Sequence, residues 1–298
     1  MSIKKEVPLA QLLEQLRQQF EQAQLFYGHG TDNPWDEAVY LVFSALGISY
    51  DEDASIMQRL VSEQELARLA PLVQQRIEKR VPVAYLVKEA WFAGYPFTVD
   101  ERVLIPRSPL AELIAQEFAS LVKQPPVRIL DLCTGSGCIG IATALGFTQA
   151  QVELADISEA ALALAELNIE RHGLGSRAKA IKSDLFTALE GPYDLILSNP
   201  PYVSQTEIDD LPPEYQHEPV LGLFSEEEGL AIPLQILRHA ADYLSADGVL
   251  IMEVGYSHEA LSARLPDVPF LWLEFAHGGE GIFMLTAEQL RAAKAALI

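Results

Sequence analysis

The C-terminal two-thirds of the sequence alternates between short apolar segments and segments with helical periodicity. The apolar segments are "VRILDL" at 127–132, "QVELADI" at 151–157, "AKAIKSDLF" at 178–186, "DLILS" at 194–198 and "GVLIMEVG" at 248–255. Helical patterns occupy 110–123, 137–146, 158–172 and 229–244. This alternation predicts a doubly wound α/β fold, in which helices cover both faces of a mostly parallel sheet. The segment 270–289 predicts two further strands around a Gly-rich turn, as an antiparallel edge pair.

The first 85 or so residues carry helix signals instead of strand signals. Asn33 suits an N-cap, Pro34 suits the first helical position, and Gly47 suits a helix end. Ser62 and Glu65 form a capping-box pattern at the start of another helix. The sequence therefore predicts a helical domain before the α/β domain.

Aromatic and β-branched residues surround Asp100 and Glu101 between residues 90 and 107, and this pattern predicts a β-hairpin. We therefore expect three parts in the chain. They are a helical N-terminal domain at 1–88, a hairpin linker at 89–109 and the α/β domain at 110–298.

Charge narrows the range of partners. The 298 residues include 42 acidic and 21 basic residues, which gives a formal net charge of −21. Affinity for a phosphate backbone comes largely from Lys and Arg, so we expect no stable binding of naked nucleic acid. An acidic chain suits a basic partner, although acidity that serves solubility alone is equally compatible with this composition.

Composition also narrows the class of protein. Hydrophobic residues make up 49% of the chain, enough for a sizeable core. No apolar run approaches the roughly 18 residues of a membrane span, and the start lacks the apolar region of a secretory signal. The two cysteines, Cys133 and Cys138, lie five residues apart with no nearby His, which supports neither a zinc site nor a disulfide framework. We expect a cytoplasmic protein without membrane contact or a bound metal.

A Gly-rich turn follows the first strand of the α/β domain, in "ILDLCTGSGCIGIATAL" at 129–145. Gly135, Gly137 and Gly140 match the dinucleotide-binding spacing, but this match alone is weak. Asp131 argues against a dinucleotide, because a carboxylate before the loop repels a pyrophosphate and attracts a cation. S-adenosylmethionine carries an ammonium and a sulfonium and has no phosphate, so it suits an acidic loop.

The next two strands also end in acidic residues. Asp156 lies about 20 residues past the glycines, where a carboxylate can accept hydrogen bonds from two ribose hydroxyls. Asp184 can accept from an adenine amino group, and Phe186 can cover the adenine ring. Each aspartate alone is also compatible with a helix cap. Three acidic strand ends in succession favour a site for S-adenosylmethionine.

The fourth strand ends in "SNPPYV", in which Asn199, Pro200, Pro201 and Tyr202 form a stiff turn. The Asn199 side-chain oxygen and the Pro200 carbonyl are two acceptors that can hold both hydrogens of a planar NH₂ group. Accepting both hydrogens directs electron density onto the nitrogen, and the ring of Tyr202 can stack on the group and favour a cationic transition state. Such catalysis rests on positioning and electrostatics. An amide and an adenine fit this turn equally well.

The motifs "DLCTGSG", "ADIS", "SDLF" and "NPPYV" resemble those of the HemK-like protein-glutamine methyltransferases, over nearly the whole chain. "IPRSPLAE" at 105–112 and "HEPVLGL" at 217–223 are similar to further segments of that family. "YGHGTDNPWDEA" at 27–38, "RVPVAYL" at 80–86 and "VDERVLIPRSP" at 99–109 are similar to the PrmB branch, which methylates a glutamine of large-subunit ribosomal protein L-three.

The resemblance implies a Rossmann-like class I methyltransferase domain and a helical N-terminal domain that helps to bind the substrate protein. It implies S-adenosyl-L-methionine as cofactor, a basic ribosomal protein as partner and N(5)-methylglutamine as product. It assigns the target amide to Asn199, Pro200, Pro201 and Tyr202. It assigns the cofactor to Asp131, Cys133, Thr134, Gly135, Gly137, Asp156, Ile157, Asp184, Leu185, Phe186 and Asn199.

Two positions depart from the wider family. Cys133 stands where Gly is usual, and Ser108, Pro109 and Leu110 replace a more polar run of the release-factor branch. Three other functions share part of the pattern. They are release-factor glutamine methylation, adenine-amino methylation of a nucleic acid, and a non-catalytic role in ribosome assembly. The stretch Tyr27–Ala38 is compatible with substrate contact or with a plain loop and capped helix.

Overall fold

The computed structural model describes residues 6–276 and 278–297, which divide into two structural units. The helical unit contains the described residues up to Ala90, together with Val99–Glu101 and Pro212–His217. The sheet unit contains Trp91–Thr98, Arg102–Leu211 and the described chain from Glu218 onward. The chain therefore leaves the sheet unit after Leu211 and rejoins it at Glu218.

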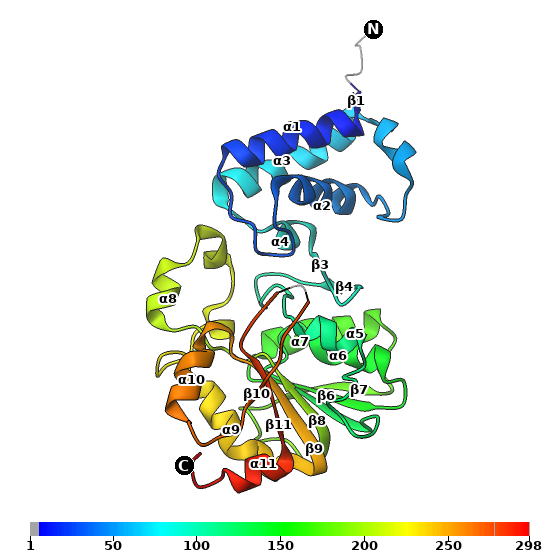
Figure 1. Cartoon of the computed structure of the whole chain (residues 1–298). Helices are drawn as coiled ribbons and strands as arrows, with labels where there is room; N and C mark the ends of the chain where they lie inside the picture. The colour runs from blue at the N-terminus through cyan, green and yellow to red at the C-terminus, as the bar shows by residue number, and fades with distance from the viewer. Residues whose placement is uncertain (1–5, 277, 298) are drawn as a thin grey trace. The chain divides into compact units, whose positions relative to one another are not determined.

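The helical unit is built around two long helices and a third of similar length, coloured from blue to cyan in Figure 1. Asn33 caps the second helix by accepting a hydrogen bond from the Asp36 N–H at 2.9 Å, and Gly47 ends it with φ at 65°. The predicted capping box of Ser62 and Glu65 is confirmed at the start of the third helix. The elements are β1 (Val7–Pro8), α1 (Leu9–Gln22), α2 (Pro34–Leu46), η1 (Ala54–Gln58), β2 (Leu60–Val61), α3 (Glu63–Lys79), α4 (Val83–Val87) and η2 (Pro213–His217).

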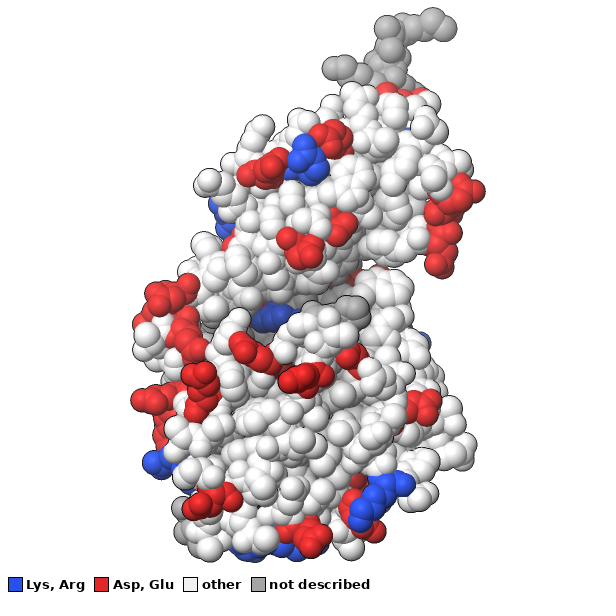
Figure 2. All heavy atoms as spheres, in the orientation of Figure 1, with Lys and Arg blue, Asp and Glu red and all other residues white. Residues whose placement is uncertain are grey.

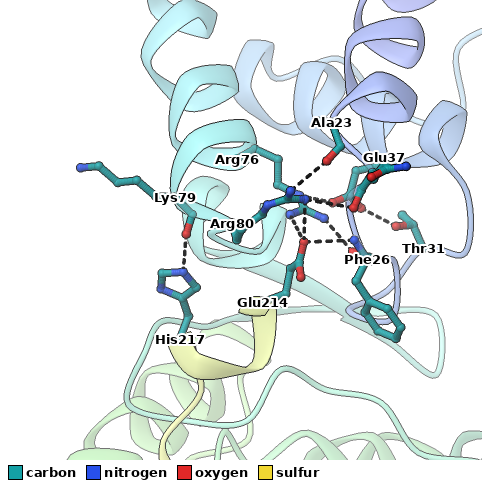
Figure 3. Close-up of polar contacts among 10 residues, drawn as sticks. Ala23, Phe26, Thr31, Glu37, Arg76, Lys79, Arg80, Glu214 and His217 are labelled. Atoms are coloured by element: carbon teal, nitrogen blue, oxygen red, sulfur yellow. Dashed lines mark hydrogen bonds and ion pairs between the residues drawn. The ribbon is translucent and has the colours of Figure 1, made fainter. Parts of the chain in front are cut away.

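A buried ion network in the helical unit connects the last turn of α3 with the first turn of α2 (Figure 3). The Arg76 side chain is 1% exposed and donates to Glu37 at 2.6 Å and to Glu214 at 3.2 Å. It also donates to the Phe26 carbonyl at 2.8 Å, while the Phe26 N–H donates to Glu214 at 3.0 Å. Thr31 donates to Glu37 as well. The stretch Tyr27–Ala38 therefore supplies one of the two carboxylates that neutralise Arg76.

The hairpin between the two predicted domains exists, but its turn lies earlier than expected. Strands β3 (Glu89–Phe92) and β4 (Tyr95–Thr98) pair with each other around Ala93 and Gly94. These two residues have φ of 49° and 81°, the backbone that a two-residue hairpin turn requires. The prediction of a turn at Asp100 and Glu101 is wrong, because the Ala-Gly pair adopts the tighter turn.

The sheet unit contains a seven-stranded sheet with the order β10-β11-β9-β8-β5-β6-β7. The strands from β5 to β9 are parallel, whereas β10 and β11 are antiparallel, which confirms the predicted sheet with an antiparallel edge pair. His277, in the predicted edge turn, lies outside the described residues. The strands are β5 (Arg128–Leu132), β6 (Gln151–Asp156), β7 (Ala178–Lys182), β8 (Tyr193–Ser198), β9 (Leu244–Glu253), β10 (Leu271–Trp272) and β11 (Ile282–Thr286).

Helices cover both faces of this sheet (Figure 1), as a doubly wound fold requires. The helices on one face are α5 (Leu110–Ala115), α6 (Cys138–Gly146) and α7 (Glu159–Arg171), and those on the other are α9 (Ala231–Tyr243), α10 (His258–Arg264) and α11 (Ala287–Ala292). The shorter elements α8 (Gln205–Asp210), η3 (Val220–Gly222) and η4 (Gly255–Ser257) lie between them in the sequence. The prediction of an α/β fold is confirmed.

The helix predicted at 110–123 is shorter than expected. It ends at Ala115, and Glu117, Phe118 and Ser120 all adopt positive φ. The Phe118 side chain is buried and stacks on Phe147 with the ring centroids 6.2 Å apart. Burial of an aromatic side chain outweighs the small gain from a continued helix. Among the described residues, no helix is long and apolar enough to cross a membrane.

Candidate active site

A cavity of about 230 Å³ opens at the carboxyl ends of the parallel strands in the sheet unit. Ligands bind at this edge in open α/β sheets. The segments after β5, β6, β7 and β8 all contribute to its walls, as do residues 102–108 and a stretch within 219–224. Of the residues predicted from the sequence, those lining it are Cys133, Thr134, Gly135, Asp156, Ile157, Asp184, Leu185, Asn199 and Pro201.

The Gly-rich turn after β5 has the backbone that its glycines allow. Gly135 has φ at 56°, and a Cβ at this position would meet no atom within 4 Å. Gly137 has φ at 83°, and a Cβ there would lie 3.0 Å from Ile141 Cδ1. Gly135 thus leaves open space at the cavity wall, which lets the backbone approach a ligand closely. Gly137 instead permits close packing of the turn on the helix.

Asp131 is fully buried behind this turn and does not line the cavity. One carboxylate oxygen, Oδ2, accepts from the Thr134 hydroxyl at 2.5 Å and from the Gly140 N–H at 2.8 Å. Burial raises the pKa of Asp131 to about 7. The structure therefore gives Asp131 a role in holding the turn on α6.

Asp156 ends β6 and lines the cavity. Its carboxylate accepts from the Gly135 N–H and the Ser158 N–H, each at 2.9 Å. Burial raises the pKa of Asp156, while these two backbone donors favour the ionised form. Ile157 follows and is 49% exposed as a residue, so an apolar side chain lies beside a fixed carboxylate.

The third strand end contributes Asp184 and Leu185 to the cavity, but Phe186 lies elsewhere. Leu185 has φ at 46°, and the backbone then directs Phe186 into the core. There the Phe186 ring stacks on Tyr243 with the centroids 4.6 Å apart. The expectation that Phe186 covers a ligand ring stays a prediction, since its side chain packs in the core and does not line the cavity.

The turn after β8 brings Asn199 and Pro201 to the cavity, whereas Pro200 is buried. None of the hydrogen bonds among the described residues uses the Asn199 side-chain amide. The Tyr202 hydroxyl donates to Glu253 at 2.9 Å, and its ring lies against Gly255, where a Cβ would come within 2.7 Å of Tyr202 Cε2. The turn therefore presents the Asn199 side-chain amide to the cavity. Tyr202 is held by Glu253 and Gly255 and does not line the cavity.

Two stretches whose role was not predicted from the sequence complete the site. Arg107 donates to both oxygens of the buried Glu218 carboxylate, at 2.7 and 2.6 Å, and the Ile105 N–H donates to it at 3.0 Å. Ser108 donates to Glu253 at 2.5 Å. These bonds join residues 105–108 to the segment around Glu218 and to the end of β9. The sequence marked both segments through their similarity to the family, in "IPRSPLAE" and "HEPVLGL", but it gave no role to Arg107 or Glu218.

Two family models match this chain. The model of the methyltransferase small domain matches residues 111–211, and the model of the PrmC N-terminal domain matches residues 11–87. Among solved structures, a methyltransferase from Pyrococcus furiosus is similar, with a TM-score of 0.46 and 17% identity, over 64% of this chain and 88% of that one.

Two relatives are more similar in sequence. The ribosomal protein uL3 glutamine methyltransferase of Francisella tularensis is 47% identical over 89% of this chain and 86% of its own length. The protein of the same name from Neisseria gonorrhoeae is 43% identical over 91% of both chains. Identity at this level over nearly the full length of both proteins establishes the family. The chain belongs to the ribosomal protein uL3 glutamine methyltransferases.

Proposed function

We propose that this enzyme transfers a methyl group from S-adenosyl-L-methionine to the side-chain nitrogen of a glutamine in ribosomal protein uL3. The observation that carries the proposal is that Asn199 opens into the same cavity as Asp156 and Gly135. The Asn199 side chain, an acceptor for an NH₂ group, and a loop suited to a nucleoside thus line one cavity. Relatives named for uL3 glutamine methylation supply the substrate.

The residues of the cavity fit the proposed cofactor. Gly135 leaves room for close approach of a ligand, and Asp156 offers a carboxylate whose orientation two backbone N–H groups fix. Asp184 and Leu185 provide an acceptor and an apolar surface on the next strand end. We assign the ribose of the cofactor to Asp156 and its adenine to Asp184 and Leu185. We assign the rest of the cofactor to the loop of Cys133, Thr134 and Gly135. When bound, the cofactor supplies an electrophilic methyl group on a sulfonium.

The chain's own contribution is to hold the target amide. The Asn199 side-chain oxygen and the Pro200 carbonyl accept the two N–H hydrogens of the glutamine amide. Both acceptors lie on a turn that two prolines stiffen, so the amide nitrogen is held in one orientation. Accepting both hydrogens raises the electron density on a nitrogen whose lone pair is otherwise delocalised. The extra proton leaves after methyl transfer, and no strong general base is needed.

Charge on the substrate side supports a basic protein partner. No Lys or Arg occurs between Lys182 and Arg238, and this interval contains the whole turn from Asn199 to Tyr202. In Figure 2, Asp and Glu side chains gather over the region of α8, which carries the exposed Asp209 and Asp210. A basic polypeptide is attracted to such a surface, whereas a phosphate backbone is repelled. We assign the helical N-terminal domain to binding of the substrate protein, and we place the reaction in the cytoplasm.

The experiment that tests the proposal offers the enzyme three acceptors with isotope-labelled S-adenosylmethionine. The acceptors are uL3 that lacks the modification, a peptide release factor that lacks it, and adenine-containing DNA. We expect the label on a glutamine of uL3, which mass spectrometry of proteolytic fragments locates. Label on the release factor or on DNA, with none on uL3, overturns the proposal.

A further inference from the structure

Glu253 occupies a position where a charged side chain is unexpected. It is the last residue of β9, whose neighbouring residue Met252 pairs with Ser198 at the end of β8. Glu253 therefore lies beside the point where the chain enters the turn of Asn199. The residue is only 6% exposed, and burial raises the pKa of its carboxyl group. Burial of a carboxylate costs free energy, so this position needs compensating contacts.

Two hydroxyl groups supply these contacts, and they come from segments far apart in the sequence. The Tyr202 hydroxyl donates to Glu253 Oε1 at 2.9 Å, and the Ser108 hydroxyl donates to Oε2 at 2.5 Å. Tyr202 belongs to the turn that holds Asn199, and Ser108 lines the cavity at the end of residues 102–108. One carboxylate thus joins the turn of Asn199 to the stretch of residues 102–108, which lines the cavity.

The remainder of Tyr202 is held just as closely. The Ser257 hydroxyl donates to the Tyr202 carbonyl at 2.9 Å. A Cβ on Gly229 would lie 2.1 Å from the same carbonyl oxygen, and one on Gly255 would lie 2.7 Å from the ring. Backbone and ring are therefore enclosed, and Glu253 fixes the one polar atom at the far end of the ring.

We propose that Glu253 is a positioning residue for methyl transfer, which holds the turn of Asn199 and the wall at Ser108 in one arrangement through its two carboxylate oxygens. The proposal rests on the proposed function, because the turn is taken to hold the amide. An apolar side chain would fill the same space at a lower desolvation cost, but it would leave both hydroxyls without this acceptor. The carboxylate is suited to accept from two donors at once.

The test compares Glu253→Ala and Glu253→Gln with the matched control Glu153→Gln. Glu153 is also buried and accepts from a tyrosine, Tyr193, at 2.5 Å, but its other partners include Arg128 at the amino end of β5. We expect Glu253→Ala to lower kcat by about 10- to 100-fold with an unchanged KM for S-adenosylmethionine, since a small misplacement of reacting groups is enough for this. Glu253→Gln should lower kcat by a smaller factor than Glu253→Ala, because its amide oxygen still accepts from one hydroxyl. Glu153→Gln should keep the wild-type kcat.

A double-mutant cycle separates positioning from general damage. If Glu253 acts through Tyr202, the variant carrying Tyr202→Phe and Glu253→Gln should be about as slow as the slower single variant. The proposal is overturned if the fold reductions in kcat of the two single variants multiply in the double variant. It is also overturned if both Glu253 variants keep the wild-type kcat. Because Glu253→Gln keeps the size of the side chain, it supplies this answer even where Glu253→Ala fails to fold.

A second readout is independent of the substrate. With 3-fluorotyrosine incorporated, the ¹⁹F resonance that Tyr202→Phe removes is that of Tyr202. We expect it to shift in Glu253→Gln and in Ser108→Ala and to stay in place in Glu153→Gln. An unmoved resonance in Glu253→Gln overturns the proposal. A shifted resonance in an enzyme that labels DNA or a release factor would instead overturn only the assignment of the uL3 substrate.

Discussion

Arg76 and Glu214 form a buried ion pair in the helical unit, although 138 residues separate them in the sequence. Both side chains are 1% exposed, and Glu37 is the second carboxylate of the network (Figure 3). Removing one member of a buried ion pair leaves a charge without its partner. We expect Glu214→Ala to lower the free energy of unfolding by about 3 kcal/mol.

Urea denaturation measures this loss, and a surface pair provides its control. Lys123 and Asp247 lie 2.5 Å apart with side chains 75% and 71% exposed. Asp247→Asn should therefore change the free energy of unfolding far less than Glu214→Ala does. Equal losses in the two variants would show that Glu214 does not neutralise Arg76 in solution.

Asn199→Ala should abolish methyl transfer while leaving cofactor affinity largely intact. The reason is that alanine removes one of the two acceptors for the glutamine amide but leaves the turn after β5 untouched. Turnover is measured with labelled S-adenosylmethionine, and affinity by calorimetry. Near-normal turnover in this variant would contradict the double-acceptor mechanism.

Asp156→Ala should show the opposite pattern, with cofactor affinity lowered by about 10-fold or more because a charged hydrogen-bond acceptor is lost. The control is Glu159→Ala, three residues later, whose carboxylate pairs with Lys182 on the surface. Calorimetry should give wild-type affinity for that variant. Unchanged cofactor affinity in Asp156→Ala would contradict the assignment of the ribose to Asp156.

Asp131 makes stability depend on pH in a direction unusual for a carboxylate. Burial raises its pKa from the ordinary 3.8 to about 7 in the folded protein, so the folded state binds the proton more tightly than the unfolded state. Its contribution to stability is complete below about pH 4 and is lost as the pH rises through about 7. Between these limits the free energy of unfolding should fall by about 1.4 kcal/mol per pH unit from this group.

Asp131→Asn should remove that component, since asparagine keeps an acceptor oxygen for Gly140 but does not titrate. The measurement is the difference in unfolding free energy between wild type and variant at several pH values. A difference that stays constant from about pH 4 to pH 8 would contradict the raised pKa.

Gly140→Ala should destabilise the sheet unit, because a Cβ there would lie 2.2 Å from Leu154 Cδ2 and 2.8 Å from Asp131 Cβ. We expect a loss of about 1–3 kcal/mol, typical of an overpacked core. Gly146→Ala in the same helix is the matched control, because no atom lies within 4 Å of a Cβ at that position. Similar melting temperatures for the two variants would contradict the close packing at Gly140.

The parts of the site that depend on strand ends could be predicted from the sequence. Asp156, Asp184 and Asn199 each follow an apolar strand, and parallel strands bring their carboxyl ends to one edge. Local helix signals at Asn33 and Ser62 were equally reliable, since a cap depends on residues within one turn.

Long-range contacts could not be predicted in this way. Phe186 turns into the core because Tyr243, 57 residues later, offers it a stacking partner. Glu253 lies at the end of an apolar strand, and nothing near it in the sequence indicates Ser108 or Tyr202 as partners. The same holds for Pro212–His217, which pack in the helical unit although they follow the strands of the sheet unit.

The membership of Pro212–His217 in the helical unit has a consequence for synthesis of the chain. A ribosome adds residues in order, so Arg76 and Glu37 are made long before Glu214, with β5 to β8 in between. The helical unit therefore reaches its complete charge pairing only after most of the sheet has been translated. For the same reason, residues 1–88 taken alone lack one of the two carboxylates that neutralise Arg76.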